Sequence, residues 1–304
     1  MAMRVVLTGA TGQLGHALQR QIPSNVDLIP VDRHALDLAD HRSCEDLVDD
    51  LRPDWILNAG AYTAVDRAES EPDLARAVNA GAPAAFADAL ARTGGRILQI
   101  STDFVFGGDQ GCPYKPDQAV HPLGVYGATK AAGEKAVLDR LSAARGAHVL
   151  RTGWLYGPVG RNFCRTMLRL HQQHAETGAP IRVVADQVGC PTSTKGLAKA
   201  CWSVIDRVVS DDTVPPILHW SDCGVASWYD FASAIGELAA SSGLIDRVAS
   251  VEAIPTSAYP TPAQRPNYSL LDCTQTRSTL GLHPLSWRES LRDVLVDIDR
   301  QSLT

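Results

Sequence analysis

The stretch MRVVLTGATGQLG, residues 3–15, decides the fold. Its mostly apolar start suits a buried strand, and Gly9, Gly12 and Gly15 follow at every third position. Glycine lets the backbone turn tightly and lets a ligand approach it, while the free N–H groups that begin a helix attract an anion. A strand, a glycine turn and a helix in this order predict a site for a dinucleotide pyrophosphate, against the alternative of a purely structural turn.

The chain around this turn alternates short apolar runs with longer helical patterns. The runs are continuous rather than alternating in polarity, which is typical of strands buried on both faces of a parallel sheet. We therefore predict an α/β fold with a Rossmann-type, doubly wound parallel sheet. The expected strands are residues 3–8, 26–31, 54–60, 95–101 and 147–152, and the expected helices are residues 13–21, 42–51, 72–92 and 127–144.

The second half of the chain is broken into shorter pieces by prolines. We predict a dinucleotide-binding domain over residues 1–152 and a smaller, interleaved C-terminal substrate-binding lobe over residues 153–304. The segments 181–186 and 217–222 have the composition of strands, and both are expected to return to the first domain.

The composition excludes several classes of protein. The net charge is -6 at pH 7, whereas nucleic-acid surfaces need clustered Lys and Arg to neutralise phosphates. The seven cysteines are scattered and form no CxxC pair, so neither a disulfide framework nor a zinc site is expected. No apolar run reaches membrane-spanning length, and the N-terminus leaves no room for a signal peptide. We expect a cytoplasmic protein that binds neither nucleic acid nor membrane.

Two charged residues after the second expected strand bear on the choice of cofactor. Asp32 stands where an acidic side chain would accept hydrogen bonds from an adenosine ribose, which favours NAD. Arg33 could instead pair with a 2′-phosphate and favour NADP. The sequence leaves NADPH and NADH both open, and a charged loop without a ligand is the simpler alternative.

A second group of polar residues follows the fourth expected strand. Ser101 and Thr102 come at its end, where an open α/β sheet presents side chains to a ligand. Tyr126 and Lys130 are four positions apart, so one helix would carry both on the same face. A strand-end cap and a solvated surface pair are the alternatives for each motif alone, and the combination of the two motifs favours a catalytic site.

Eight segments, in order along nearly the whole chain, resemble the dTDP-4-dehydrorhamnose reductase family of extended short-chain dehydrogenase/reductases. Their combination is more specific than any single motif. The segments are TGATGQLG (8–15), NAGAYTAVDRAE (58–69), STDFVFGG (101–108), YGATK (126–130), RTGWLYG (151–157), NFCRTML (162–168), DQVGCPT (186–192) and RPNYSLLD (265–272).

The resemblance implies NAD(P)H-dependent reduction of the C4 ketone of dTDP-4-dehydro-L-rhamnose to dTDP-L-rhamnose, with Thr102, Tyr126 and Lys130 as catalytic residues. Hydride arriving at a carbonyl carbon builds negative charge on oxygen, which a proton donor must meet. Tyr126 would be that donor. Lys130 is expected to lower the pKa of Tyr126 and to hold the nicotinamide ribose, while Thr102 orients the carbonyl.

The resemblance also implies which residues bind the two ligands. The substrate would contact Asp103, Phe104, Trp154 and Arg265, and the guanidinium of Arg265 suits a diphosphate. Phe104 stands where family members often carry tyrosine, so one polar contact is missing. Besides Tyr126 and Lys130, the cofactor would contact Gly9, Thr11, Gly12, Gln13, Leu14, Gly15, Asp32, Arg33, Asp37, Leu38, Ala59, Ala61 and Thr63.

The resemblance also bears on metal binding and assembly. Some family members hold a magnesium ion between two subunits through acidic residues, one of them in the first helix. This chain has His16 and Ala17 there, so magnesium bridging of that kind is not expected, while a homodimer is left open. His171 and His174 are predicted to lie on an exposed helix face rather than to bind a metal, because no third ligand is near in sequence.

Three alternatives share part of this pattern. A reductase of a related dTDP-4-keto-6-deoxysugar would keep every catalytic residue, because sequence spacing does not report which face of the ketone meets the hydride. A dehydratase fits less well, since Thr102 is followed by Asp103 and Phe104 rather than by an Asp-Glu pair. An epimerase fits the reductase-like segments 58–69 and 265–272 less well. A non-catalytic NADP-binding regulatory subunit, like that of methionine adenosyltransferase, also resembles the family, although a complete catalytic set argues for an enzyme.

Overall fold

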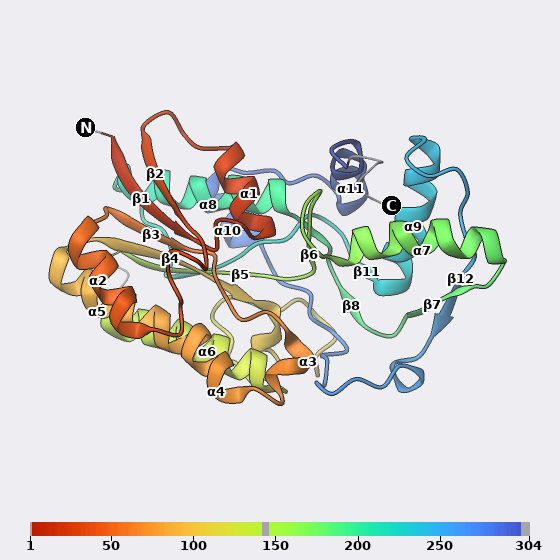
Figure 1. Ribbon diagram of the computed structural model, residues 1–304, viewed down its shortest axis with the longest axis horizontal. Helices are drawn as coiled ribbons and strands as arrows, with labels where there is room; N and C mark the ends of the chain where they lie inside the picture. Colours follow the sequence, from red (N-terminus) through yellow and green to blue (C-terminus); the bar gives the residue numbers. More distant parts are fainter. Residues whose placement is uncertain (1, 142–145, 299–304) are drawn as a thin grey trace.

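A computed structural model of the protein describes residues 2–141 and 146–298 (Figure 1). Its centre is a six-stranded, wholly parallel sheet with the strand order β10-β5-β4-β3-β1-β2. The chain starts inside this sheet and moves outward in both directions, so the order reverses between β1 and β3, and open α/β sheets bind ligands at such a point. The strands are β1 (Met3–Thr8), β2 (Val26–Val31), β3 (Trp55–Asn58), β4 (Arg96–Thr102), β5 (Ala147–Thr152) and β10 (Ile217–His219).

Helices cover both faces of this sheet (Figure 1). Residues of β1 point alternately to the two sides, with Val5 and Leu7 in one buried cluster and Val6 in another. This confirms the predicted Rossmann-type, doubly wound α/β sheet. The helices on the side of Val5 are α1 (Gln13–Arg20), α8 (Thr194–Val209) and α10 (Thr274–Leu280), and those on the side of Val6 are α2 (His41–Leu51), α5 (Ala82–Thr93) and α6 (Val125–Arg140).

The segment expected as one helix over residues 72–92 is helical but not uniform. It consists of α4 (Pro72–Arg76), a π-helical turn η1 (Ala77–Gly81) and α5. Pro83 has no N–H, so the carbonyl of Asn79 lacks its α-helical donor and the local register widens. The turn directs the buried side chain of Asn79 inward, where its amide oxygen accepts from the Tyr62 N–H at 2.9 Å.

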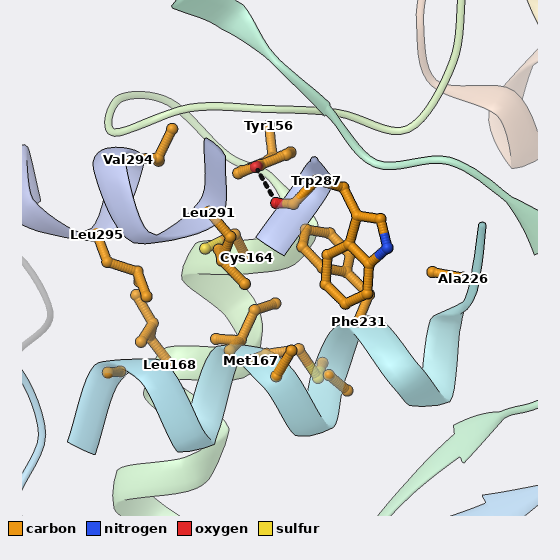
Figure 2. Close-up of a cluster of buried hydrophobic side chains, with 14 of the residues drawn as sticks. Tyr156, Cys164, Met167, Leu168, Ala226, Phe231, Trp287, Leu291, Val294 and Leu295 are labelled. Carbon is orange, nitrogen blue, oxygen red and sulfur yellow. Dashed lines mark hydrogen bonds between the residues drawn. The ribbon is translucent and has the colours of Figure 1, made fainter. Parts of the chain in front are cut away.

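The described part of a smaller lobe contains three α-helices and three short two-stranded sheets. Tyr156, Phe231 and Trp287 are the large side chains of its core, and the Tyr156 hydroxyl donates to the Trp287 carbonyl at 3.5 Å (Figure 2). The helices are α7 (Phe163–Thr177), α9 (Trp228–Ser241) and α11 (Trp287–Val296). The strand pairs are β6 (Leu155–Tyr156) with β9 (Thr192–Ser193), β7 (Ile181–Val184) with β12 (Val251–Ile254), and β8 (Val188–Gly189) with β11 (Ala226–Ser227).

Two expectations for this half of the chain are wrong. The segment 181–186 does not return to the main sheet: β10 occupies the edge beside β5, and Ile181 and Val183 of β7 pack instead into the core of the smaller lobe. His171 is not on an exposed face. Its ring is fully buried between α7 and α9, where Nε2 lies 3.0 Å from the Ala232 carbonyl oxygen.

The expected return of the segment 217–222 to the main sheet is observed, since its residues Ile217–His219 pair with β5. The division of the chain at residue 152 stays a prediction. Among the helices of residues 2–141 and 146–298, none has both the length and the apolar character needed to cross a membrane.

Candidate active site

A pocket of about 930 Å³ opens at the carboxyl ends of β1, β3, β4 and β5, where the strand order reverses. Segments from all four strand ends line it, beginning at Thr8, Ala59, Ile100 and Thr152. Every residue predicted to be catalytic, cofactor-binding or substrate-binding contributes to its walls. The structure therefore gathers the whole predicted set, which is spread from Gly9 to Arg265, into one cavity.

The glycine turn forms one end of this pocket and cannot hold larger residues. Gly9 has a φ of 67°, and a Cβ there would lie 2.8 Å from the Gly60 backbone. A Cβ at Gly15 would lie 2.3 Å from the Gly9 carbonyl oxygen. Gly12 precedes the first residue of α1 and has no side chain to cap it, so the N–H groups of the first turn remain available to an anion. This cradle fits a dinucleotide pyrophosphate.

The hydroxyl of Thr8 ties the ends of β1 and β3 together below the turn. It donates to the Asn58 amide oxygen at 2.5 Å and accepts from the Gly60 N–H at 3.1 Å. Asn58 in turn donates to the Gln99 amide oxygen of β4 at 2.7 Å. Strands β1, β3 and β4 are thus joined to one another by buried side-chain hydrogen bonds.

Asp32 and Arg33 lie at the adenosine end that the fold predicts, after β2. One oxygen of Asp32 accepts from the His34 N–H at 2.9 Å and the Ala35 N–H at 3.0 Å, and these bonds lower its pKa. Asp32 thus stabilises its own loop, which supports part of the simpler alternative. Arg33 is exposed beside it on the pocket wall.

Thr102, Tyr126 and Lys130 all line this pocket, and Thr102 and Tyr126 are hydrogen-bonded to each other. Thr102 ends β4, while Tyr126 and Lys130 are one turn apart in α6. The Thr102 hydroxyl donates to the Asp103 carboxylate at 3.0 Å and accepts from the Phe104 N–H at 3.2 Å. Lys130 is 4% exposed and donates from Nζ to the Ile100 carbonyl oxygen at 2.6 Å.

The electrostatics of these groups differ from the expected pattern. Burial raises the pKa of Tyr126 to about 12; the hydrogen bond with Thr102 opposes this shift, and the Asp103 carboxylate adds to it. Burial lowers the pKa of Lys130 to about 8, against the attraction of Glu134. The net direction for Tyr126 is thus opposite to the expected one, because desolvation outweighs the other contributions at the phenol. The Lys130 ammonium donates to the Ile100 carbonyl, and an effect of Lys130 on the pKa of Tyr126 stays a prediction.

A buried ion pair that includes Glu134 lies near Lys130, and the negative charge of Glu134 attracts the ammonium. The carboxylate of Glu134, one turn further along α6, accepts two hydrogen bonds from Arg151 of β5, at 2.9 Å from Nε and 2.7 Å from Nη2. Ser101 donates to the same carboxylate. Both charged side chains are at most 5% exposed, so each charge is balanced by its partner in this bidentate pair rather than by water.

Aromatic rings from the smaller lobe form the opposite wall. Trp154 and Trp228 stack with ring centroids 3.6 Å apart and planes within 2°. Trp154 has a φ of 51°, and a Cβ at Gly189 would lie 2.6 Å from its indole, so the backbone is shaped around this ring. Phe104 contacts Tyr126 edge to face with centroids 5.8 Å apart.

Comparison with known proteins fits this geometry. The family model of the RmlD substrate binding domain matches residues 3–300. A dTDP-4-dehydrorhamnose reductase of Aggregatibacter actinomycetemcomitans is 37% identical over 294 residues, covering 96% of this chain and 98% of that protein.

The chain belongs to the dTDP-4-dehydrorhamnose reductase family.

Solved structures of this family have the same architecture. The crystal structure of a dTDP-4-dehydrorhamnose reductase from Clostridium acetobutylicum matches with a TM-score of 0.85 and 37% identity, covering 97% of this chain and 99% of that one. The enzyme of Bacillus anthracis, solved in complex with NADP, matches with a TM-score of 0.85 and 33% identity over the same shares.

Arg265, for which the family resemblance suggested a diphosphate contact, has a partner within the protein. Its two terminal nitrogens donate to the two carboxylate oxygens of Asp66 at 3.0 and 2.9 Å, and Nη1 also donates to the Thr261 hydroxyl at 2.5 Å. Asp66 belongs to α3 (Val65–Ala68), so the pair joins the C-terminal part of the chain to the first domain. This partner was not predicted, because 199 residues separate the two.

Several further pocket residues of this family member escaped sequence reasoning. Tyr62 donates to Glu71 at 2.5 Å, and Arg67 donates to the other oxygen of the same carboxylate at 2.5 Å. Arg161 and Trp228 also line the pocket. The first three lie in or next to the family-like segment 58–69, which could have indicated them, whereas no local pattern marked Trp228.

Metal binding is a further sequence prediction that concerns this site. Across residues 2–141 and 146–298, no group of three or more His, Cys, Asp or Glu side chains is placed to hold a metal ion. The expectations on magnesium, on a homodimer and on a cytoplasmic location stay predictions from the sequence.

Proposed function

We propose that the protein is a dTDP-4-dehydrorhamnose reductase that reduces the C4 ketone of dTDP-4-dehydro-L-rhamnose to dTDP-L-rhamnose. The observation that carries this proposal is the meeting of Thr102, Tyr126 and Lys130 in the pocket that also contains the glycine turn. A proton donor thereby lies beside a cradle for a nicotinamide dinucleotide. The names of the relatives, matched over nearly the whole chain, support the same substrate.

In this proposal each catalytic side chain has one task. The cofactor, when bound, supplies the hydride. Tyr126 donates the proton to the developing alkoxide, and its raised pKa keeps the phenol protonated throughout the neutral range. Thr102 hydrogen-bonds the ketone oxygen and holds it towards the phenol. Lys130 binds the nicotinamide ribose through its ammonium.

The substrate-binding roles of Asp103, Phe104, Trp154 and Arg265 belong to the same proposal. Asp103 is 2% exposed, and burial raises its pKa to about 6. At neutral pH its carboxylate can therefore accept a hydrogen bond from a sugar hydroxyl. Trp154 offers an apolar surface to the deoxysugar, and Arg265, which is paired with Asp66, lines the same pocket.

NADPH is the preferred cofactor in this proposal, with NADH as the alternative. Asp32 uses one carboxylate oxygen to stabilise its own turn, whereas Arg33 is exposed at the end where an adenosine 2′-phosphate would lie. The NADP complex of the Bacillus anthracis relative supports this choice.

The test is a reductase assay with dTDP-4-dehydro-L-rhamnose generated in situ. We expect oxidation of NADPH faster than of NADH, and a product with the L-rhamno configuration at C4 by NMR. Turnover only with another dTDP-4-keto-6-deoxysugar would identify the related reductase instead. NADPH binding without oxidation by any such ketosugar would contradict the proposal and favour the regulatory subunit.

A further inference from the structure

The start of helix α6 is capped by a residue from a distant part of the chain. Gly124 precedes the helix and has no side chain that could accept from its first N–H groups. The Val125 N–H instead donates to the Glu69 carboxylate at 2.8 Å. Glu69 lies 56 residues earlier, directly after α3. An acidic side chain at this end is favourable, because it satisfies an unpaired donor and faces the positive end of the helix dipole.

We propose that Glu69 is a positioning residue for the proton donor Tyr126, holding the first turn of α6 so that the phenol faces the substrate carbonyl. The inference rests on the proposed reductase function. It goes beyond that function by assigning to an exposed carboxylate outside the catalytic set a measurable share of the rate.

The packing around Gly124 and Gly127 shows that this turn is held on two sides. A Cβ at position 124 would lie 2.6 Å from the Glu69 carboxylate oxygen, so a glycine is what admits the carboxylate. A Cβ at position 127 would lie 2.1 Å from the Phe104 carbonyl oxygen. Tyr126 stands between these two contacts, with the Glu69 bond on the residue before it. Loss of that bond would free the turn on one side.

Lys130 is anchored by different contacts, which separates it from Tyr126. Its ammonium donates to the Ile100 carbonyl. The hydroxyl of the neighbouring Thr129 accepts a hydrogen bond from the Asn79 side-chain amide at 3.2 Å. The buried Glu134–Arg151 pair holds the next turn. Removal of Glu69 should therefore displace Tyr126 while leaving Lys130 in place, so that the rate falls and cofactor binding does not.

Glu69 is itself held by a rigid corner. In α3, three residues before it, Asp66 pairs with Arg265 and accepts from the Ala263 N–H at 3.2 Å. The capping carboxylate is thus attached to a segment that the C-terminal part of the chain fixes from outside. This supports a positioning role over that of a freely moving surface side chain.

The experiment compares Glu69→Ala, Glu69→Gln and Glu289→Ala with the wild type. Glu289 is a matched control: it is an exposed carboxylate that caps the start of α11 by accepting from the Ser286 N–H at 3.0 Å, and α11 does not line the pocket. Each protein is measured for kcat, for the Kd of NADPH, for thermal stability, and for hydrogen exchange at the amides of residues 125–130.

We expect Glu69→Ala to lower kcat about tenfold, since small misplacements of a catalytic group cost rate, while the Kd of NADPH changes less than about twofold. Exchange should become faster at the start of α6. Glu69→Gln should recover much of kcat, because its amide oxygen can still accept the Val125 N–H. Glu289→Ala should lower stability by a similar amount and leave kcat unchanged.

Three results would overturn the proposal: an unchanged kcat in Glu69→Ala, a parallel loss of NADPH affinity, or no recovery in Glu69→Gln. Failure of the reductase function gives a different picture, since the wild type would then turn over no ketosugar. In that case the exchange measurement still decides whether Glu69 holds the turn that carries Tyr126, and unchanged exchange would overturn the assignment.

Discussion

The base and the rim of the pocket are built in different ways. At the base, Thr102, Asp103 and Lys130 are at most 6% exposed, and burial moves the pKa values of Asp103 and Lys130 towards the neutral range. At the rim, Asp32 and Arg33 remain in contact with solvent, and the pKa of Asp32 is lowered chiefly by hydrogen bonds from the backbone of Ala35 and His34. The difference teaches that burial shifts pKa values at the base, where we propose the chemistry, while solvent keeps the rim groups close to their ordinary behaviour.

The same contrast separates the two charged pairs near the site. Glu134 and Arg151 are buried below Lys130, whereas Asp66 and Arg265 keep 40% and 25% of their side-chain surfaces exposed. Breaking a buried pair leaves an uncompensated charge, while a half-exposed pair is screened by water. We expect substitutions at the base to have larger effects than substitutions at the rim.

The largest effect is expected for Tyr126→Phe. Removing the phenolic proton should lower kcat by about 10²- to 10⁴-fold, the usual contribution of general acid catalysis, with the Kd of NADPH nearly unchanged. Steady-state kinetics and cofactor titration measure the two quantities. Tyr259→Phe is the control, because Tyr259 is 57% exposed outside the pocket. Undiminished turnover in Tyr126→Phe would remove Tyr126 from the role of proton donor.

A smaller but double effect is expected for Lys130→Met. This change keeps most of the length of the side chain and removes its charge, so the proposed ribose contact is lost together with the positive charge near the proton donor. We expect the Kd of NADPH to rise by about tenfold, as for a charge-assisted hydrogen bond, and kcat to fall as well. Lys135→Met is the control, since Lys135 is on the same helix but exposed. Unchanged NADPH affinity would contradict the ribose contact.

The pH dependence of the wild type should report the same buried ammonium. Lys130 is charged below its pKa of about 8 and neutral above it, so kcat and NADPH affinity should fall as the pH rises through about 8. Tyr126 does not limit the rate there, because its pKa of about 12 keeps it protonated. In Lys130→Arg the alkaline decline should vanish from this range. A decline centred near the ordinary lysine value instead would show that burial does not control the site.

The smallest effect is expected at the rim, for Arg33→Ala. Loss of an exposed guanidinium that meets a 2′-phosphate should weaken NADPH by about fivefold and leave NADH unchanged, because solvent screens the pair. The ratio of the two kcat/KM values measures this preference, and Arg169→Ala, an exposed arginine of α7 outside the pocket, is the control. Equal weakening of both cofactors would assign Arg33 to a different contact.

The elements that could be predicted are those with a local signature. The strands, the glycine turn and the Tyr126–Lys130 spacing depend on neighbours within a few residues, and the structure reproduces each of them. The segment 181–186 could not be placed, because its apolar residues suit either the main sheet or the smaller core, and the edge position taken by β10 decides between them.

The sequence by itself determined the fold class, the position of the glycine turn and the Tyr126–Lys130 spacing, since backbone freedom, hydrophobic period and helical spacing are local properties. Only the tertiary structure decided that Arg265 pairs with Asp66, that Glu69 caps the catalytic helix, and that the Tyr126 pKa rises. Those outcomes depend on which distant groups share a desolvated or closely packed space, and the packing of the whole chain establishes that.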